Sequence, residues 1–530
     1  MMKKLLMLCL PFATTMALAQ RDENAAKYAA TITPQALKEK LTILAGADME
    51  GRETASPGQK KAAAWIESQF KSFGLLPGNG DSYQQLYPVY QDQLTSSKLM
   101  VNGKNFDFDK DYSFGITSGN WKYGEVVFAG YGIVDSLKGT NDFAGLDVKG
   151  KVVLVLDNPN AAPAFGVRGG GGNGGQAAGA PRPYRAPTAA ESVRKLGGIG
   201  LVTVIDFNAP NRRPAQTKGR MSIVAPAAPA AGTTTGTLAP FFTASVSNAV
   251  ASALMGRTST IALADLKNIN KGTYYSEFVV SAERSTVTLE SSNVIGILPG
   301  TSKKDEYVFM TGHYDHLGKN AKGQIFYGAD DDGSGSVGVI QEAEAFAAAY
   351  KAGHKPKRTL VFMTVSGEEK GLLGSAYYGD HPTVDLAKVS ADLNTDMIGR
   401  GDSSRKGDTL NYIYVIGHDK LSSELSTLSE TINKQYITNL ALDYKYDDPN
   451  DQNRIYYRSD HYNFAKKGVP ILFYYDGMLG ADYHQLTDTV DKIQFDVMSR
   501  RAQLVFHTGW VIANKDAMLK RDIPLNMPAR

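Results

Sequence analysis

Cysteine is almost absent from this sequence. Its 530 residues include only one, Cys9, which lies in a short apolar segment near the N-terminus. Beyond that segment the chain can form no disulfide bond, use no thiolate nucleophile and offer no cysteine ligand to a metal. A transition-metal site, if there is one, must therefore use histidine and carboxylate side chains.

A strong excess of charge of one sign is also missing. The formal net charge is +3, and it becomes 3 − 2 = +1 if Lys3 and Lys4 are removed with an N-terminal signal. A near-neutral chain gives no reason to expect nucleic acid or an anionic membrane as a partner. No apolar run reaches the length that a transmembrane helix needs, so we expect no stable membrane insertion.

Residues 1–19 have the pattern of a secretory signal peptide. Lys3 and Lys4 precede an apolar run, and Ala17 and Ala19 form a small-residue cleavage motif before Gln20. Cleavage near Ala19 would export the chain to the periplasm, the cell surface or the medium. The residue directly before Cys9 is Leu8, whereas a lipoprotein signal would have a small residue at that position. We therefore do not expect a lipid anchor at Cys9.

Two helices are predicted in the first part of the mature chain. Thr33 caps the first, Pro34 stands in its first turn, and an apolar stripe runs to Leu44. The second begins at Ser56-Pro57 and ends at Gly74. Both patterns are typical of helices that cover a sheet.

The residue pattern changes twice along the chain. Between residues 96 and 274, short apolar runs separated by glycine-rich turns predict an inserted β-rich domain. Its Gly/Ala/Pro-rich segments, 165–187 and 225–237, are interpreted as surface loops, because the first lacks the Gly-Lys-Ser/Thr ending of a phosphate-binding loop. From residue 275 to 530, apolar strands alternate with helices, which predicts an α/β sheet flanked by helices. Residues 25–95 are assigned to the same discontinuous domain as 275–530.

Polar clusters follow the strand-like runs of the α/β part, which also contains all eight histidines, between His313 and His507. In open α/β sheets, ligands gather outside the carboxyl ends of the strands. Ser334 is expected to cap the helix that follows the acidic cluster of Asp330, Asp331 and Asp332. Within an extended segment, His313 can bind a metal while Asp315 orients its ring. The five clusters contain His313 and Asp315; Asp330, Asp331 and Asp332; Glu368 and Glu369; Asp396; and His484 and Asp488.

The chemistry of these clusters favours a metal site. Two histidines and several carboxylates suit zinc, with Co²⁺ or Mn²⁺ as substitutes. There are enough ligands for two ions that share one bridging carboxylate. Adjacent carboxylates such as Glu368 and Glu369 are tolerated together if one binds a cation and the other moves a proton.

Five motifs carry a resemblance to a known family. In order and spacing, "GHYDHLG", "GADDDGSG", "SGEEKGLLGS", "NTDMIG" and "YHQLTDT" resemble those of the secreted co-catalytic di-zinc aminopeptidases of peptidase clan MH, family twenty-eight. The insert, with "GYGI" and "NDFAGLDVKGKVVLVL", resembles the protease-associated (PA) domain found in many of these enzymes. The resemblance implies a mixed, mostly parallel sheet, two zinc ions and peptide substrates with a free amino terminus.

The resemblance also implies a role for each residue. Asp331 would bridge both ions. Glu368 would be the general base that takes a proton from water, and Tyr483 is a candidate donor to the oxyanion. His316 and His461 are not expected to be ligands, and Asp330 and Asp332 are expected to support or cap. The remaining ligands would be His313 and Asp396 in one site, and Glu369 and His484 in the other.

Three alternatives share the motifs. A carboxypeptidase of the glutamate carboxypeptidase type needs an arginine clamp for the terminal carboxylate. No arginine or lysine lies between Val469 and Asp488, although Arg454 and Arg458 are near. Relatives of glutaminyl cyclase work with a single zinc, and a non-catalytic binding protein on this fold would usually have lost ligands, whereas all five positions are present here.

Overall fold

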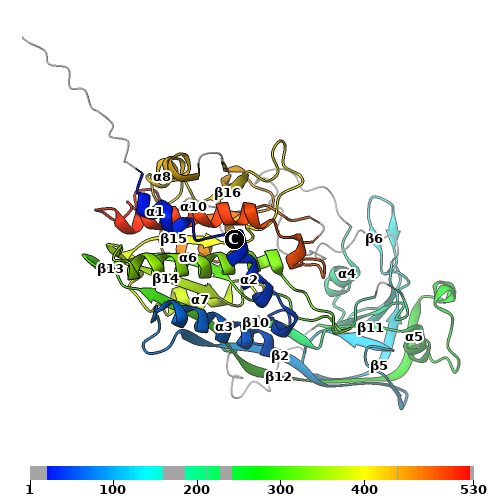
Figure 1. Ribbon diagram of the computed structural model, residues 1–530. Coiled ribbons are helices and arrows are strands. Elements are labelled where there is room, and N and C mark those ends of the chain that lie inside the picture. The colour runs from blue at the N-terminus through cyan, green and yellow to red at the C-terminus, as the bar shows by residue number, and fades with distance from the viewer. Residues whose placement is uncertain are drawn as a thin grey trace, which may run out of the picture. The chain divides into compact units, whose positions relative to one another are not determined.

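The computed structural model describes residues 21–158, 186–210, 212–226, 241–437, 440–480 and 482–525. The predicted signal peptide and most of the two Gly/Ala/Pro-rich segments lie outside these residues. The chain divides into two compact units (Figure 1). We call Met1–Leu86 with Ser291–Arg530 the discontinuous unit, and Tyr87–Glu290 the inserted unit. Among the described residues, no helix has both the length and the apolar character that crossing a membrane requires.

The discontinuous unit is built on a mixed, mostly parallel sheet, as the sequence predicts. The strand order is β17 (Ala441–Asp443), β16 (Tyr412–Ile416), β18 (Ile471–Tyr475), β15 (Val389–Thr395), β13 (Lys303–His313), β14 (Arg358–Val365) and the last part of β12 (Gly272–Leu298). The four central strands, β18, β15, β13 and β14, run parallel to one another, whereas β16 is antiparallel to β18 and β12 is antiparallel to β14. The short β1 (Leu76–Pro77) pairs with β12.

Both faces of the sheet are covered, so β14 and β18 consist mainly of apolar residues and are buried along their whole length. Every residue of β15 is buried too, although its sequence includes polar residues, of which Asp392 and Asn394 both accept the hydroxyl of Thr311. A strand with one face in water would instead alternate between apolar and polar residues.

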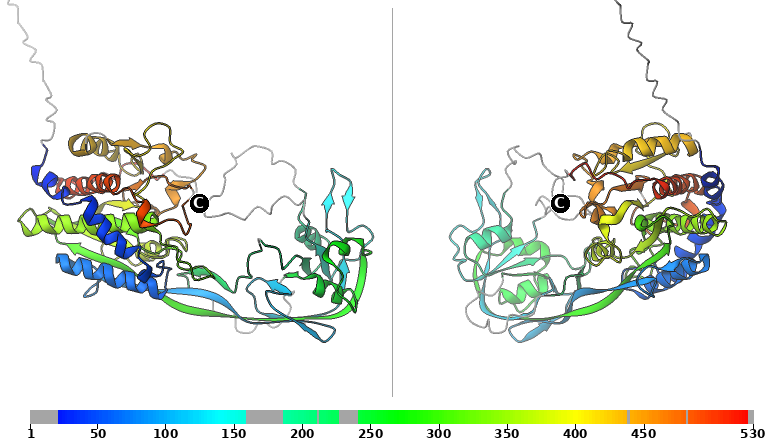
Figure 2. Two further views of the ribbon diagram at one scale, coloured as in Figure 1. Left: turned by 45° about the vertical axis from the view of Figure 1, so that its right-hand side comes forward. Right: turned by 90° about the vertical axis from the view of Figure 1, so that its left-hand side faces the viewer.

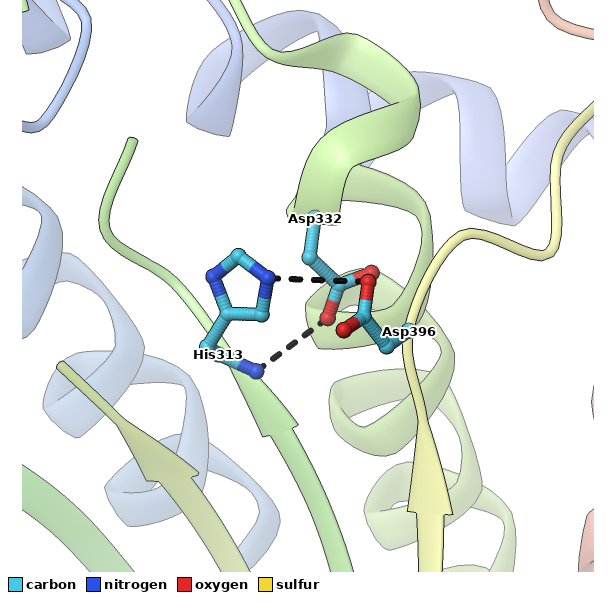
Figure 3. A group of neighbouring side chains, drawn as sticks. All are labelled: His313, Asp332 and Asp396. Atoms are coloured by element: carbon cyan, nitrogen blue, oxygen red, sulfur yellow. Dashed lines mark hydrogen bonds and ion pairs between the residues drawn. The ribbon is translucent and has the colours of Figure 1, made fainter. Parts of the chain in front are cut away.

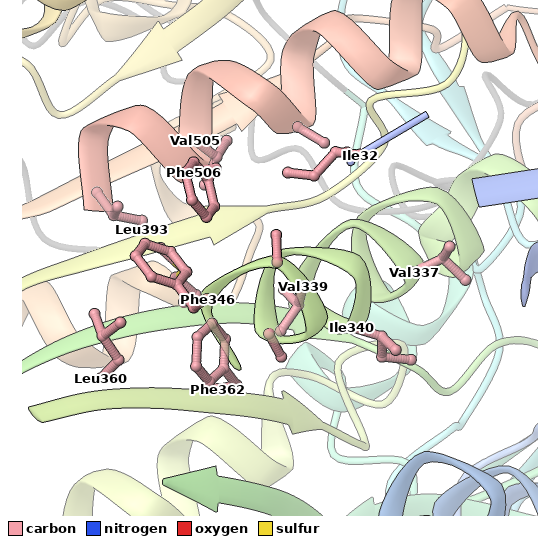
Figure 4. Packing of buried hydrophobic residues seen from close by; sticks show 14 of the residues in the cluster. Ile32, Val337, Val339, Ile340, Phe346, Leu360, Phe362, Leu393, Val505 and Phe506 are labelled. Atoms are coloured by element: carbon pink, nitrogen blue, oxygen red, sulfur yellow. The ribbon is translucent and has the colours of Figure 1, made fainter. Parts of the chain in front are cut away.

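Helices from distant parts of the chain cover the two faces of this sheet (Figures 1 and 2). One face packs against α6 (Gly335–Lys351) and α10 (Phe495–Asn514), together with α1 (Glu23–Ala29), α2 (Pro34–Leu44) and α3 (Pro57–Phe73). The opposite face packs against α7 (Leu373–Asp380) and α9 (His461–Ala465). At the centre of the first layer, the Phe346 ring lies 4.2 Å from that of Phe506 and 5.9 Å from that of Phe362 (Figure 4).

Local signals fix the predicted helix ends, with one exception. The Thr33 hydroxyl accepts the Ala36 N–H at the start of α2, and Gly74 ends α3 at φ +83°. The prediction for Ser334 is wrong. Ser334 stands at the N-cap of α6 but makes no capping bond, since its hydroxyl donates to Asp330, and the Gly335 N–H bonds instead to Asp332.

The inserted unit contains its own small sheet. It has the order β5 (Gly119–Phe128), β8 (Val152–Leu156), β9 (Gly200–Val204), β11 (Phe242–Val246) and β4 (Tyr112–Phe114), and the first four strands are parallel. Helix α5 (Asn248–Leu254) packs on one face and α4 (Ala189–Lys195) on the other. The early part of β12 pairs with β5, and β2 (Gln84–Val101) pairs with β3 (Lys104–Phe106) and β10 (Lys218–Ser222).

The remaining described elements are short connections. They are β6 (Val134–Asp135), β7 (Thr140–Asn141), α8 (Leu425–Ile432), η1 (Ala47–Met49), η2 (Leu263–Asn268), η3 (Ala329–Ser334), η4 (Leu386–Lys388), η5 (Asn433–Ile437), η6 (Lys445–Asp447), η7 (Ile455–Tyr457) and η8 (Val490–Lys492).

Candidate metal centre

The three central strands deliver polar residues to one edge of the sheet. Strand β13 ends at His313, β14 ends three residues before Glu368, and β15 ends immediately before Asp396. Because the three strands are parallel, their carboxyl ends lie at the same edge. The sheet therefore brings together residues that are far apart in the sequence.

The acidic segment before α6 is held in place by backbone hydrogen bonds. The carboxylate of Asp488 accepts the Asp330 N–H at 3.0 Å and the Asp331 N–H at 3.1 Å. Arg52 is wholly buried and donates to the carbonyls of Tyr327 and Gly328, which directly precede the acidic segment, at 2.8 and 2.9 Å. These contacts fix the direction in which the Asp331 side chain points.

Asp331 occupies the centre of the cluster. Its Oδ1 lies 3.3 Å from Nε2 of His313, and its Oδ2 lies 3.0 Å from Nε2 of His484. A carboxylate that directs one oxygen to each of two histidines has the arrangement that a bridging ligand requires.

One side of the centre contains His313 and Asp396. Nε2 of His313 lies 3.6 Å from Oδ1 of Asp396 (Figure 3). Asp332 also lies beside His313, but both of its oxygens already accept backbone N–H groups, from Gly335, Met397 and His313 itself. Asp332 therefore supports the backbone through both oxygens, whereas Oδ1 of Asp331 faces His313.

The other side contains Glu369 and His484. Oε2 of Glu369 lies 3.2 Å from Nε2 of His484, and Oε1 lies 2.8 Å from Nδ1 of His316. The side chain of His484 is 25% exposed, whereas that of Glu369 is 4% exposed. The cluster thus opens to solvent on the His484 side.

Glu368 stands beside the cluster without joining it. Its Oε2 lies 3.9 Å from Nε2 of His313, farther than the oxygens of Asp331 and Asp396. Burial raises the pKa of Glu368 well above its ordinary value, and the charges of Glu369 and Asp396 raise it further, against an opposing effect of His313. Glu368 thus lies beside the other carboxylates, farther from His313 than Asp331 and Asp396 do, with a raised affinity for a proton.

Asp315 supports two functional residues at once. Nδ1 of His313 lies 3.1 Å from the backbone carbonyl of Asp315 and 3.7 Å from its carboxylate. The carboxylate accepts the Glu368 N–H at 3.2 Å and the Thr54 hydroxyl at 2.6 Å. The sequence predicts contact through the Asp315 side chain, whereas the shorter contact to the His313 ring comes from its carbonyl.

Tyr483 lies against His484 on the solvent-facing side of the cluster. Its ring stacks on that of His484, with centroids 3.9 Å apart, and its hydroxyl accepts a hydrogen bond from Nη2 of Arg458 at 3.0 Å. His461 lies elsewhere, with Nε2 2.8 Å from the carbonyl of Tyr456 and its ring stacked on Phe473.

The buried atoms of the cluster fit a pair of cations. His313 Nε2 and Asp331 Oδ2 are buried and have no hydrogen-bond partner, which is costly unless a cation or proton satisfies them. Burial alone would lower the pKa of His484, but Asp331 and Glu369 raise it to about 11, which shows how strongly the carboxylates attract positive charge. The separations of 3.0–3.3 Å between the Asp331, Glu369 and histidine atoms are those of neighbouring ligands on one zinc, given bonds of about 2.0–2.2 Å.

Two contributors escape sequence reasoning. Arg52 donates to four carbonyls, those of Leu44, Tyr314, Tyr327 and Gly328, and a carbonyl leaves no trace in residue identity. His316 has a signal in the sequence, since it follows His313 in "HYDH", but extended spacing places it off the His313 side.

The fold and the cluster together define an α/β protein with a candidate metal centre at the carboxyl ends of its strands. Residues 293–509 match the family model described as Peptidase family M28. Over those residues the match confirms the resemblance found in the motifs.

Similar proteins include aminopeptidases and zinc metalloproteases. A probable leucine aminopeptidase of Trichophyton verrucosum is 32% identical over 226 residues, 42% of this chain and 57% of that protein. A probable zinc metalloprotease of Pyrenophora teres f. teres is 26% identical over 277 residues, 45% of this chain and 54% of that protein. The chain thus matches little more than half the length of these relatives. The zinc aminopeptidase of Bacillus subtilis superposes with a TM-score of 0.51 at 18% identity, over 93% of this chain and 99% of that one, which shows a shared fold.

Proposed function

We propose that this chain is a zinc-dependent exopeptidase that removes residues from the amino terminus of peptides. The observation that carries the proposal is the position of Asp331 between His313 and His484, with Asp396 and Glu369 completing two ligand sets. The names of the relatives, an aminopeptidase and a zinc metalloprotease, support the same reading.

The ligand sets suit two Zn²⁺ ions, and Co²⁺ or Mn²⁺ should substitute because they accept the same imidazole and carboxylate donors. His313 and Asp396 would hold one ion, Glu369 and His484 the other, and Asp331 both. When bound, zinc lowers the pKa of water towards neutrality and polarises a carbonyl oxygen.

The protein's own residues supply proton transfer and orientation. Glu368 would take a proton from the attacking water and deliver it to the leaving amine. Its backbone N–H is tied to Asp315, which also contacts His313, so base and ligand keep a fixed spacing. The Tyr483 hydroxyl, positioned by Arg458, would donate a hydrogen bond to the carbonyl oxygen as negative charge develops there.

The carboxypeptidase alternative needs a free cation for the terminal carboxylate. Arg458 is the arginine beside Tyr483, and its Nη2 already donates to the Tyr483 hydroxyl. Arg454 lies over the ring of Tyr457, 4.7 Å from its centroid. Neither arrangement favours a carboxylate clamp over amino-terminal recognition.

The two alternatives can be separated with one peptide library. We would digest peptides with free or acetylated amino termini, each with a free or amidated carboxyl terminus, and identify the released residues by mass spectrometry. The proposal predicts release of amino-terminal residues from free peptides and none from acetylated ones. A carboxypeptidase would instead cleave acetylated peptides with a free carboxyl terminus and would not cleave peptides with an amidated one.

Two further assignments are proposals about the rest of the chain. We propose that the inserted unit is a PA domain and that the discontinuous unit is the peptidase domain, supported by the split at Leu86/Tyr87 and Glu290/Ser291. We also propose export after cleavage near Ala19, on the signal pattern of residues 1–19.

A further inference from the structure

His316 is held in a fixed place next to the candidate metal centre. It is completely buried, its N–H donates to the carbonyl of Arg52 at 3.1 Å, and its ring packs against Gly328. A Cβ at Gly328 would lie 2.5 Å from the His316 ring, so only glycine leaves room for the imidazole there. The surrounding backbone therefore leaves the ring little freedom.

The ring of His316 contacts one functional group. Nδ1 lies 2.8 Å from Oε1 of Glu369, while the other oxygen of Glu369 lies 3.2 Å from Nε2 of His484. The two imidazole rings are 5.9 Å apart and nearly perpendicular. The contact between Nδ1 and Oε1 is an ion pair without hydrogen-bond geometry, and neither nitrogen of His316 has a hydrogen-bond partner, although an unpaired buried imidazole is costly. The Glu369 carboxylate is thus held between two histidines, one at each oxygen.

The contacts of His316 differ from those of His484. His484 forms close contacts with both Asp331 and Glu369, at 3.0 and 3.2 Å, as ligands of one ion do. His316 forms its one ion-pair contact with Glu369 and none with Asp331, although the three residues are within 4.8 Å of one another. Its nitrogen meets the oxygen of Glu369 that faces away from His484.

We propose that His316 is a positioning residue for Glu369, donating from Nδ1 to Oε1 so that Oε2 is directed to the ion shared with His484 and Asp331. This inference rests on the metal centre of the proposed function. A hydrogen bond to the outer oxygen of a ligating carboxylate fixes its rotation and its basicity. Without it, Glu369 can turn about its last side-chain bond, and the ion on the His484 side loses a preorganised ligand.

The test is zinc binding by the full-length protein, independent of turnover. Apo protein would be titrated with Zn²⁺ by calorimetry, with a chromophoric chelator as competitor to resolve tight sites. We expect His316→Ala to weaken one of the two sites by about 10- to 100-fold and to leave the other unchanged. His316→Gln, whose amide can donate to Oε1, should restore much of the loss. His381→Ala, which removes an exposed histidine, is the matched control.

Each outcome decides the inference. Selective weakening with rescue by glutamine supports positioning. Unchanged affinities in His316→Ala overturn it, and so does equal weakening in the alanine and glutamine variants, which would indicate direct ligation or general damage to the fold. Circular dichroism and a thermal melt of each variant identify such damage. If wild-type protein binds no zinc at all, the proposed function fails rather than the role of His316 alone.

Discussion

Oδ2 of Asp331 lies 3.0 Å from Nε2 of His484, although the two residues come from opposite ends of the segment that matches the M28 family model. The other oxygen of Asp331 faces His313 at 3.3 Å. In the absence of a cation, so many buried carboxylates in one place would repel one another. This repulsion would be offset if the carboxylates and histidines bound positive ions between them.

The free position of Glu368 gives the first prediction. Glu368→Gln keeps the shape of the side chain but cannot accept a proton, so kcat should fall by about 10²- to 10⁴-fold. Zinc content should stay at the wild-type level, because Glu368 is farther from His313 than the oxygens of the proposed ligands Asp331 and Asp396 are. Steady-state kinetics on aminoacyl chromogenic amides, with metal analysis of the same sample, would check both. Undiminished turnover would remove Glu368 from its role.

Tyr483 provides a test of the oxyanion donor. Burial, together with the charge of Asp331, raises the pKa of its hydroxyl well above the ordinary value, so it remains a donor at neutral pH. We expect Tyr483→Phe to lower kcat by about 10²- to 10³-fold with little change in zinc affinity. A variant with normal kcat would show that Tyr483 only packs on His484.

Arg52 should be a determinant of stability that lysine cannot replace. Its planar guanidinium donates to four backbone carbonyls, and lysine has neither the reach nor the fork geometry to do so. We expect Arg52→Lys to lower the free energy of unfolding by about 2 to 4 kcal/mol, measured by denaturant titration. A loss below about 0.5 kcal/mol, the size of a neutral surface change, would contradict this account.

Local chemistry explains which elements could be predicted from sequence. Caps at Thr33 and Gly74 mark α2 and α3, and continuous apolar runs mark β14 and β18, because those signals act within a few residues. The long strands β2 and β12 are missed as single elements, since polar residues interrupt their apolar pattern. The capping bond of α6 is mispredicted for another reason: the Ser334 hydroxyl donates to Asp330 and accepts the N–H of the distant Ile398, and Asp332 bonds to the Gly335 N–H instead.

The residues of the candidate site could be predicted from the sequence, but the contacts that hold them in place could not. Every residue predicted as a ligand lies in one cluster, because parallel strands end at one edge. The support of Asp331 by Asp488 and Arg52 depends on backbone groups brought together only by folding. The contact between His316 and Glu369 is likewise tertiary, and spacing within "HYDH" does not reveal it.

Glu342 gives a pH dependence away from the metal centre. It is completely buried in α6, both of its oxygens lack a partner, and burial raises its pKa well above the ordinary 4.5. The native state therefore holds a proton that the unfolded chain releases above pH 4.5. Stability is greatest below that pH and declines as pH rises towards the folded-state pKa, by about 1.4 kcal/mol per pH unit for one group.

Glu342→Gln should remove this decline. We expect its unfolding free energy to exceed that of wild type by a margin that grows from pH 5 to pH 7, measured by denaturant titration at each pH. Glu344→Gln, on the same helix with a side chain that is 43% exposed, should leave the slope at the wild-type value. Parallel slopes for wild type and Glu342→Gln would show that Glu342 is not protonated in the native state.

The presence of the paired ions is the claim on which the other roles depend, and metal analysis of active enzyme tests it most directly. Purified protein would be assayed for zinc by mass spectrometry and for aminopeptidase activity before dialysis against a chelator, after it, and after zinc is returned. We predict two zinc ions per chain, loss of activity with their removal and recovery on addition of Zn²⁺. Fully active protein that contains no transition metal and tolerates the chelator would contradict the account.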